Sequence, residues 1–96
     1  MATKTVKLSP DAIEKLPNDR PVVYRITGSG KNAVYVGVAK RGRVLDRLKE
    51  HLPTGKDPIP GGTKVKIEQM ESIKRAVQKE TRLIERDKPR YNKQGK

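Results

Sequence analysis

Two short segments rich in β-branched residues, separated by a glycine-containing turn, restrict the fold of this chain most strongly. The segments are "PVVYRI" (residues 21–26) and "AVYVGVA" (residues 33–39), and "TGSGKN" lies between them. Alternating strand-forming residues on both sides of a short polar turn are typical of a β-hairpin. We therefore expect two neighbouring antiparallel strands in the middle of the fold.

A hairpin turn centred on Ser29 and Gly30 would place Tyr24 directly opposite Tyr35. Opposed residues share one face of the sheet, with Cβ atoms about 5 Å apart. The same face would carry small residues, which leave space beside the two phenols, and the other face would carry valines. The small residues are Ala33, Gly37 and Ala39, and the valines are Val23, Val34, Val36 and Val38. An ordinary stabilising cross-strand aromatic pair is the alternative explanation.

The remaining segments predict three helices and one more strand. Apolar spacing and a Ser-Pro start predict helices, alternation predicts the strand, and a run of prolines and glycines predicts a loop. The expected helices are 9–16, 42–52 and 71–86, the strand is 63–69, and the loop is 53–62. The predicted fold is α+β, with the order α-β-β-α-β-α and helices flanking a small three-stranded, mostly antiparallel sheet.

Composition sets further bounds on the chain. Its 96 residues suffice for one small domain, with residues 93–96 as a frayed tail, and only 32% of the residues are hydrophobic. The chain has no cysteine and a single histidine, so disulfides, thiol chemistry and multi-histidine metal sites are excluded. The first residues lack the apolar run of a signal peptide, and no segment is long enough to span a bilayer. We expect a cytoplasmic protein, nucleoid-associated if bacterial, with no membrane partner.

The charge of the chain is strongly positive, and it is unevenly distributed. The formal net charge is +12, and most of the excess lies in residues 21–52 and 71–96. A basic surface of this kind predicts a phosphate-bearing partner such as nucleic acid. With no Phe, no Trp and three Tyr, the chain offers few rings for base stacking, so contact with the nucleic-acid backbone is the better expectation.

Glu80 occupies an unusual position in the C-terminal helix. Apolar residues spaced three and four apart would line one face, namely Ile73, Ala76, Val77, Leu83 and Ile84, and Glu80 lies in the middle of that face. A carboxylate turned toward a core is costly unless it is paired or binds a metal. A structural ion pair with an arginine and a metal-ligand role both explain the position.

The helix after the hairpin carries a second set of polar candidates. Arg43, Arg47 and His51 are spaced four apart, so they lie along one side of that helix. An arginine there could bind a phosphate through two hydrogen bonds. Local ion pairs on a solvated face are the alternative explanation.

Taken in order, these motifs resemble those of the GIY-YIG nuclease superfamily. Its two namesake triplets correspond to "VVY", which ends in Tyr24, and "YVG", which begins at Tyr35 and ends at Gly37. An arginine and a histidine four residues apart follow, as Arg47 and His51 do. In "ETRLIERDKPRYN" the glutamate precedes the proline by nine residues, and Asn92 closes the match. The resemblance covers residues 21–92, although the first triplet lacks the glycine of the family and Arg43 stays a competitor of Arg47.

The resemblance implies a metal-dependent endonuclease that hydrolyses phosphodiester bonds, with double-stranded or branched DNA as substrate and a role in DNA repair or recombination. Glu80 would hold one Mg²⁺ or Mn²⁺ ion, and Arg47 would bind the scissile phosphate. Tyr24 would act as the base and Tyr35 as its partner, with His51 assisting. Lys40, Arg43 and Asn92 would help to bind the substrate, and Gly37 would be structural.

Two other functions stay open from the sequence. The first is a catalytically silent DNA-binding module of the same fold, and the second is a small basic protein associated with RNA or the ribosome. Because the motifs leave little room for a separate DNA-binding region, we also expect a protein partner that supplies targeting.

Overall fold

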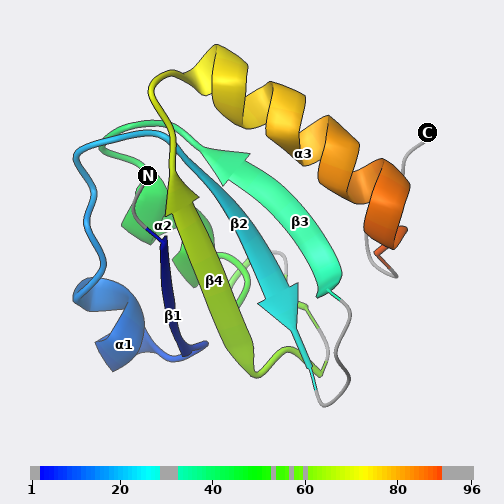
Figure 1. Cartoon of the computed structure of the whole chain (residues 1–96). Coiled ribbons are helices and arrows are strands. Elements are labelled where there is room, and N and C mark those ends of the chain that lie inside the picture. Colours follow the sequence, from blue (N-terminus) through cyan, green and yellow to red (C-terminus); the bar gives the residue numbers. More distant parts are fainter. Residues whose placement is uncertain (1–2, 29–32, 53, 57, 60, 90–96) are drawn as a thin grey trace.

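The computed structural model describes residues 3–28, 33–52, 54–56, 58–59 and 61–89. Seven elements follow one another along the chain, and Figure 1 shows a sheet with helices on both of its sides. They are β1 (Thr3–Lys7), α1 (Pro10–Glu14), β2 (Val22–Thr27), β3 (Ala33–Ala39), α2 (Val44–Lys49), β4 (Lys64–Gln69) and α3 (Ile73–Asp87). The predicted α+β class and the predicted flanking of a sheet by helices are confirmed.

The sheet has four strands where the sequence predicted three. Its order is β1-β4-β2-β3, and every pairing is antiparallel. The additional strand, β1, pairs with β4 at one edge of the sheet, with Val6 opposite Val65. Four of its five residues are exposed. An exposed edge strand that is rich in Lys and Thr has little of the apolar alternation that identifies a strand in a sequence.

The two sides of the sheet have separate cores. One core contains Tyr24 and packs against α1 and α2, through residues such as Ile13 and Leu48. The other core packs against α3, and its members are Val23, Ala33, Val36, Met70, Ala76 and Leu83. In Figure 1 the yellow-to-orange α3 lies across β2 and β3, whereas α2 lies on the far side of the sheet. The tyrosines and α3 therefore lie on opposite sides.

The register of the β2–β3 hairpin differs from the predicted one by two residues. Tyr24 is opposite Gly37 and Tyr35 is opposite Ile26, and the register shifts between Ile26 and Thr27. Because side chains alternate with a period of two, this shift keeps both tyrosines on one face. The predicted turn centre at Ser29 and Gly30 lies outside the described residues.

Smaller corrections concern single side chains. Val77 is 43% exposed, although the helical pattern placed it on the buried face of α3. Val34 packs with the tyrosine-side core and Ala33 with the α3-side core, the reverse of the predicted assignment. The irregular register near the start of β3 accounts for this reversal, because it breaks the alternation at that end.

The helix boundaries follow local capping. The Ser9 side chain accepts a hydrogen bond from the backbone of Ala12 at the start of α1, and Ser72 does the same for Arg75 at the start of α3. Lys88, the residue that caps the end of α3, adopts a left-handed conformation with φ of 46°.

Within the described part of the chain, no helix is long and apolar enough to cross a membrane.

Candidate active site

Tyr24 lies at the centre of a buried polar cluster on the α2 side of the sheet. Its side chain is 0% exposed because β2 is an inner strand and helix α2 covers this face. Its hydroxyl shares a hydrogen bond of 2.7 Å with Nε2 of His51, which is also 0% exposed. The two residues are 27 positions apart in the chain, so only the folded structure brings them together.

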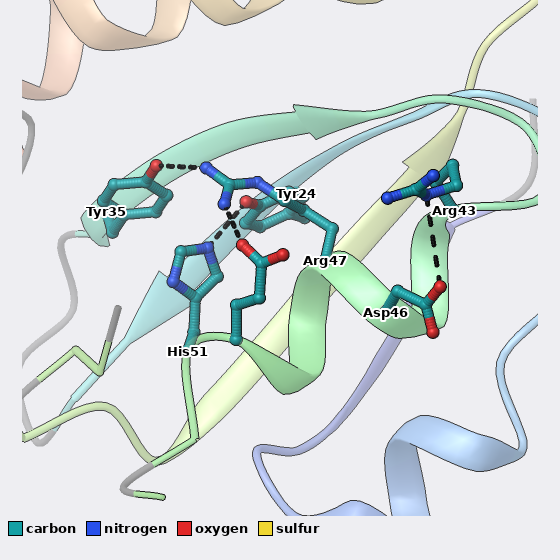
Figure 2. Close-up of polar contacts among 7 residues, drawn as sticks. Tyr24, Tyr35, Arg43, Asp46, Arg47 and His51 are labelled. Atoms are coloured by element: carbon teal, nitrogen blue, oxygen red, sulfur yellow. Dashed lines mark hydrogen bonds and ion pairs between the residues drawn. The ribbon is translucent and has the colours of Figure 1, made fainter. Parts of the chain in front are cut away.

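Tyr35 and Arg47 form the more accessible part of the cluster. Nη2 of Arg47 donates a hydrogen bond of 3.2 Å to the Tyr35 hydroxyl, and Nη1 pairs with Glu50. The Tyr35 ring lies 6.1 Å from that of Tyr24 and 4.7 Å from that of His51, measured between ring centroids. Figure 2 shows the two phenols, the imidazole and the guanidinium gathered above the sheet.

Gly37 makes the close packing of the tyrosines possible. A Cβ atom at this position would lie 2.5 Å from the Tyr24 hydroxyl oxygen and 3.0 Å from Cε2 of Tyr35. Real Cβ atoms do not approach so closely, and the neighbouring phenols are held in a packed core. The third residue of the "YVG" triplet therefore has to be glycine if both rings are to keep their places.

The start of α2 is fixed by a residue from the preceding loop. Oδ1 of Asn18 accepts a hydrogen bond of 2.8 Å from the backbone N–H of Val44, and the backbone of Asn18 binds that of Gly42. A side chain that caps the first turn satisfies a backbone donor that the helix leaves unpaired. Asn18 therefore helps to fix the orientation in which α2 presents Arg47 to the sheet.

A groove of about 330 Å³ opens where β3 ends and α2 begins. Lys40, Arg43, Arg47 and Glu50 line it together with Val38 and Ala39. Arg43 lies apart from the phenols in Figure 2 and is joined there to Asp46, with its Nε 4.0 Å from Oδ2 of Asp46. Of the two competing arginines, Arg47 is the one that contacts the tyrosine cluster. The groove is thus lined by three cations, one of which also binds Tyr35.

Glu80 approaches this cluster from the other side of the sheet. It is partly buried on α3, and within the described part of the chain it forms no hydrogen bond or ion pair. Burial raises the pKa of its carboxyl above the ordinary value, and the positive charge of Arg47 partly offsets that rise. α3 lies on the side of the sheet opposite the tyrosines, and the charge of Arg47 is felt at Glu80 across the sheet, of which β3 is an edge strand. A direct ion pair between Glu80 and an arginine, the alternative that the sequence left open, is not found among the described residues.

Burial and neighbouring charges shift the pKa values of Tyr24 and Arg47. Burial raises the pKa of the Tyr24 phenol well above its ordinary value, and Tyr35 and Glu80 add to the rise while Arg47 opposes it. Partial burial disfavours the charge of Arg47, but the neighbouring Tyr24, Glu50 and Tyr35 outweigh this and raise the pKa of its guanidinium. Tyr24 is therefore a neutral phenol, and Arg47 is a permanent cation.

Most of the predicted site residues lie in or beside this cluster. Tyr24, Tyr35, Arg47 and His51 are in contact or close ring packing, and Lys40 and Arg43 line the adjoining groove. Asn92 lies outside the described residues. Asn18 was not predicted as a site residue, and Glu50 was considered only as a local ion-pair partner of its basic neighbours, a role that its pair with Arg47 confirms. The spacing of Glu50, three residues after Arg47, indicates a helical ion pair, whereas nothing in the sequence marks Asn18 as a cap for a helix so far along the chain.

No protein-family model and no curated protein matches the chain. Among solved structures, the chain is similar to the GIY-YIG N-terminal endonuclease domain of UvrC from Thermotoga maritima bound to its catalytic divalent cation, magnesium. The TM-score is 0.68 at 25% identity, and the match covers 84% of this chain and 96% of the other. A point mutant of the same domain, also bound to its cation, matches with a TM-score of 0.62 at 24% identity. That match covers 85% of this chain and 96% of the other.

Proposed function

The chain is a GIY-YIG-like domain with a nuclease-like fold, and we propose that it is a metal-dependent endonuclease that hydrolyses phosphodiester bonds in DNA. The observation that carries the proposal is the partly buried Glu80 carboxylate. It lies in the field of Arg47 and Tyr24 and forms no hydrogen bond or ion pair among the described residues. A partly buried carboxylate without such a partner is the kind of group that a hard divalent cation binds.

Glu80 would hold a Mg²⁺ or Mn²⁺ ion at the edge of the sheet. Among the described residues, no three His, Asp or Glu side chains cluster as metal ligands. Water and substrate oxygens would therefore complete the coordination, as is common for Mg²⁺. When bound, the cation supplies positive charge to the scissile phosphate and to the leaving oxygen. The similar domain of UvrC is described with magnesium as its catalytic cation.

Arg47 would bind a non-bridging oxygen of the phosphate, where negative charge accumulates during attack. Its guanidinium is already oriented by Glu50 and Tyr35, so little conformational freedom is lost when the phosphate binds. Lys40 and Arg43 line the same groove and would bind the flanking phosphates. Asn92, which follows α3 in the sequence, would help to bind the substrate, as the sequence predicts.

Tyr35 is the better candidate for positioning and deprotonating the attacking water, in the reverse order to the sequence expectation. It is partly exposed, and its hydroxyl receives a hydrogen bond from Arg47, a cationic donor that stabilises an ionised phenol. Tyr24 is enclosed, and burial raises the pKa of its phenol. Tyr24 and His51 would instead form a packed support that holds Tyr35 in place.

A cleavage assay with supercoiled plasmid tests the function directly. The purified chain should nick or linearise the plasmid with Mg²⁺ or Mn²⁺, and EDTA should stop the reaction. Loss of activity in the Arg47→Ala variant, measured at matched protein purity, excludes a contaminating nuclease. Salt-sensitive plasmid binding without cleavage at any divalent metal concentration would contradict the proposal and favour a catalytically silent binding module.

A further inference from the structure

Part of the α3 side of the sheet carries a concentration of positive charge that the proposed cleavage site does not use. α3 packs mainly against β3 and β2. The β4 residues on this side are those that lie opposite Val23, Arg25 and Thr27 of β2, and the β1 residues on this side lie opposite those β4 residues. Their exposed basic members are Lys7, Lys64 and Lys66. Beside α3, this half of the sheet is a basic, largely polar surface.

Like charges lie directly opposite one another on this surface. Lys7 pairs with Lys64 across β1 and β4, and Lys66 pairs with Arg25 across β4 and β2. Directly opposed like charges destabilise a sheet, whereas opposite charges at such positions stabilise it. Two adjacent pairs of this kind weaken the free fold, and a polyanion bound over them would reverse the effect.

One flank of α3 continues the charge. Its basic residues Arg75, Lys79, Arg82 and Arg86 are spaced four, three and four apart, so they form a stripe along the helix. Lys79 and Arg86 meet Arg25 and Lys66 in a groove of about 140 Å³ between the helix and the sheet. The stripe therefore extends along the α3 border of the basic sheet surface.

The acidic groups on this surface neutralise only part of the charge. Glu68 pairs with Lys79 at 2.6 Å, and Asp87 pairs with Arg86 at 2.9 Å and with Arg25 at 3.5 Å. Lys7, Lys64 and Lys66 form no ion pair within the described ranges. Nε of Arg25 is buried and lacks a hydrogen-bond acceptor there. The surface thus retains, in Lys7, Lys64 and Lys66, exposed cations for a ligand that carries negative oxygens.

We propose that this surface, the α3–β4 basic face (Lys7, Arg25, Lys64, Lys66, Lys79 and Arg86), binds the phosphate backbone of duplex DNA at a second position, separate from the cleavage site. The choice of DNA rests on the proposed function, whereas the need for a polyanion rests on the charges alone. Among the described residues, no aromatic one lines the groove, so backbone contact fits better than stacking on single-stranded bases. The groove that contains Arg47 lies on the α2 side, so the two contacts involve different segments of the DNA.

The test compares two variants with the same loss of charge. In one, Lys7, Lys64 and Lys66 are changed to Gln. In the control, three other exposed lysines are changed to Gln, namely Lys4, Lys15 and Lys56. Fluorescence anisotropy in EDTA, with a short labelled duplex and a salt titration, measures binding without cleavage. Each lost phosphate contact lowers the slope of log K against log salt by about 0.9.

We expect the Lys7, Lys64 and Lys66 variant to bind at least about tenfold more weakly at low salt, with a salt slope smaller by about 2 to 3. The control variant should change affinity by about twofold, as expected for a small change in net charge. Equal weakening of both variants would overturn the proposal. Because the variant relieves like-charge repulsion, its melting temperature should equal or exceed that of the parent. If it unfolds, the single Lys66→Gln variant is compared with Lys4→Gln in the same assay.

The same variants separate this proposal from the proposed function. If the chain cleaves DNA, the maximal rate at saturating DNA should be unchanged in the Lys7, Lys64 and Lys66 variant, and only the DNA concentration for half-maximal rate should rise. A fall in the maximal rate at saturation would contradict a separate binding face. If the parent chain cleaves nothing, the anisotropy comparison still decides whether the face binds DNA.

Discussion

The two polar regions on opposite sides of the sheet are built differently. On the α2 side, Tyr24, Tyr35, Arg47 and His51 hold one another through hydrogen bonds and ring packing, and Tyr24 and His51 are fully buried. On the α3–β4 basic face, Lys7, Lys64 and Lys66 are exposed, lie opposite other basic residues and form no ion pair among the described residues. The first arrangement fixes a few groups at set distances, as chemistry requires, whereas the second supplies charge without fixed positions, as backbone binding requires.

This comparison predicts that substitutions in the two regions affect different measurements. A change on the α2 side should alter the rate of cleavage at saturating DNA. A change on the α3–β4 basic face should alter affinity and its dependence on salt. Glu80 and Lys79 are neighbours on α3, yet they face different regions. Substitutions on a single helix can therefore separate catalysis from binding.

The largest expected effect is that of Glu80→Gln. The variant keeps the shape of the side chain but loses the charge that would hold the cation, so cleavage should fall by at least about 10³-fold. Binding to duplex DNA in EDTA should change little, because the basic face is intact. Rates are measured with plasmid substrate in Mg²⁺. Cleavage within tenfold of the parent rate would remove Glu80 from the site.

Removing the hydroxyl of Tyr35 should mainly lower the cleavage rate, whereas removing that of Tyr24 should mainly lower stability. Tyr35→Phe should lower the cleavage rate by about 10² to 10⁴-fold with little change in melting temperature, because it removes an acid–base group. Tyr24→Phe should cost about 1 to 3 kcal/mol of unfolding free energy, because Nε2 of His51 loses a buried hydrogen bond. Chemical denaturation and single-turnover cleavage of both variants measure the contrast, and a larger rate loss in Tyr24→Phe would reverse our assignment of roles.

Gly37→Ala should disturb the α2-side cluster through packing alone. The added methyl group would meet the hydroxyl end of the Tyr24 ring at a Cβ distance of 2.5 Å. Overpacking of this kind destabilises a core by about 1 to 3 kcal/mol. We expect a lower melting temperature and slower cleavage, with the salt slope of DNA binding unchanged. A variant of parental stability and rate would show that the close contact is not required.

The smallest expected effect concerns pH. Burial raises the pKa of Glu80 in the folded chain, so its ionised form is less favourable in the folded than in the unfolded state. The Glu80 contribution to stability should therefore be greatest when the carboxyl is protonated, and it should fall as pH rises from the unfolded pKa to the raised folded pKa. Subtracting the melting temperatures of Glu80→Gln from those of the parent across this range isolates the effect. A difference that increases with pH would contradict the sign.

Much of the α2-side cluster could be predicted from sequence because its members belong to short ordered motifs. Alternation in β2 and β3 placed Tyr24 and Tyr35 on one face. Helical spacing placed Arg47 and His51 on one side of the expected helix 42–52, although α2 ends at Lys49 and His51 lies in the turn after it. The two-residue register error did not change the predicted face of the tyrosines, because an even shift keeps Tyr24 and Tyr35 on the same side of the sheet. The fold class followed from the same periodicities.

The remaining features depend on which elements are neighbours, and local patterns do not encode that. β1 pairs with β4, whose residues are about sixty positions away, so a polar edge strand leaves almost no local signal. Lys64 and Lys66 are exposed on β4, but their like-charged partners appear only once the strand order is known. The side of the sheet that α3 covers, opposite the tyrosines, likewise appears only in the folded structure.

The location of a bound cation tests the central claim most directly. Crystals soaked in Mn²⁺ give an anomalous scattering peak at each metal position, independent of any activity. Our account predicts a peak within coordination distance of the Glu80 carboxylate, on the side facing Arg47 and Tyr35, and no such peak in Glu80→Gln crystals. A strong peak at Glu50 or Glu68, with none at Glu80, would contradict it.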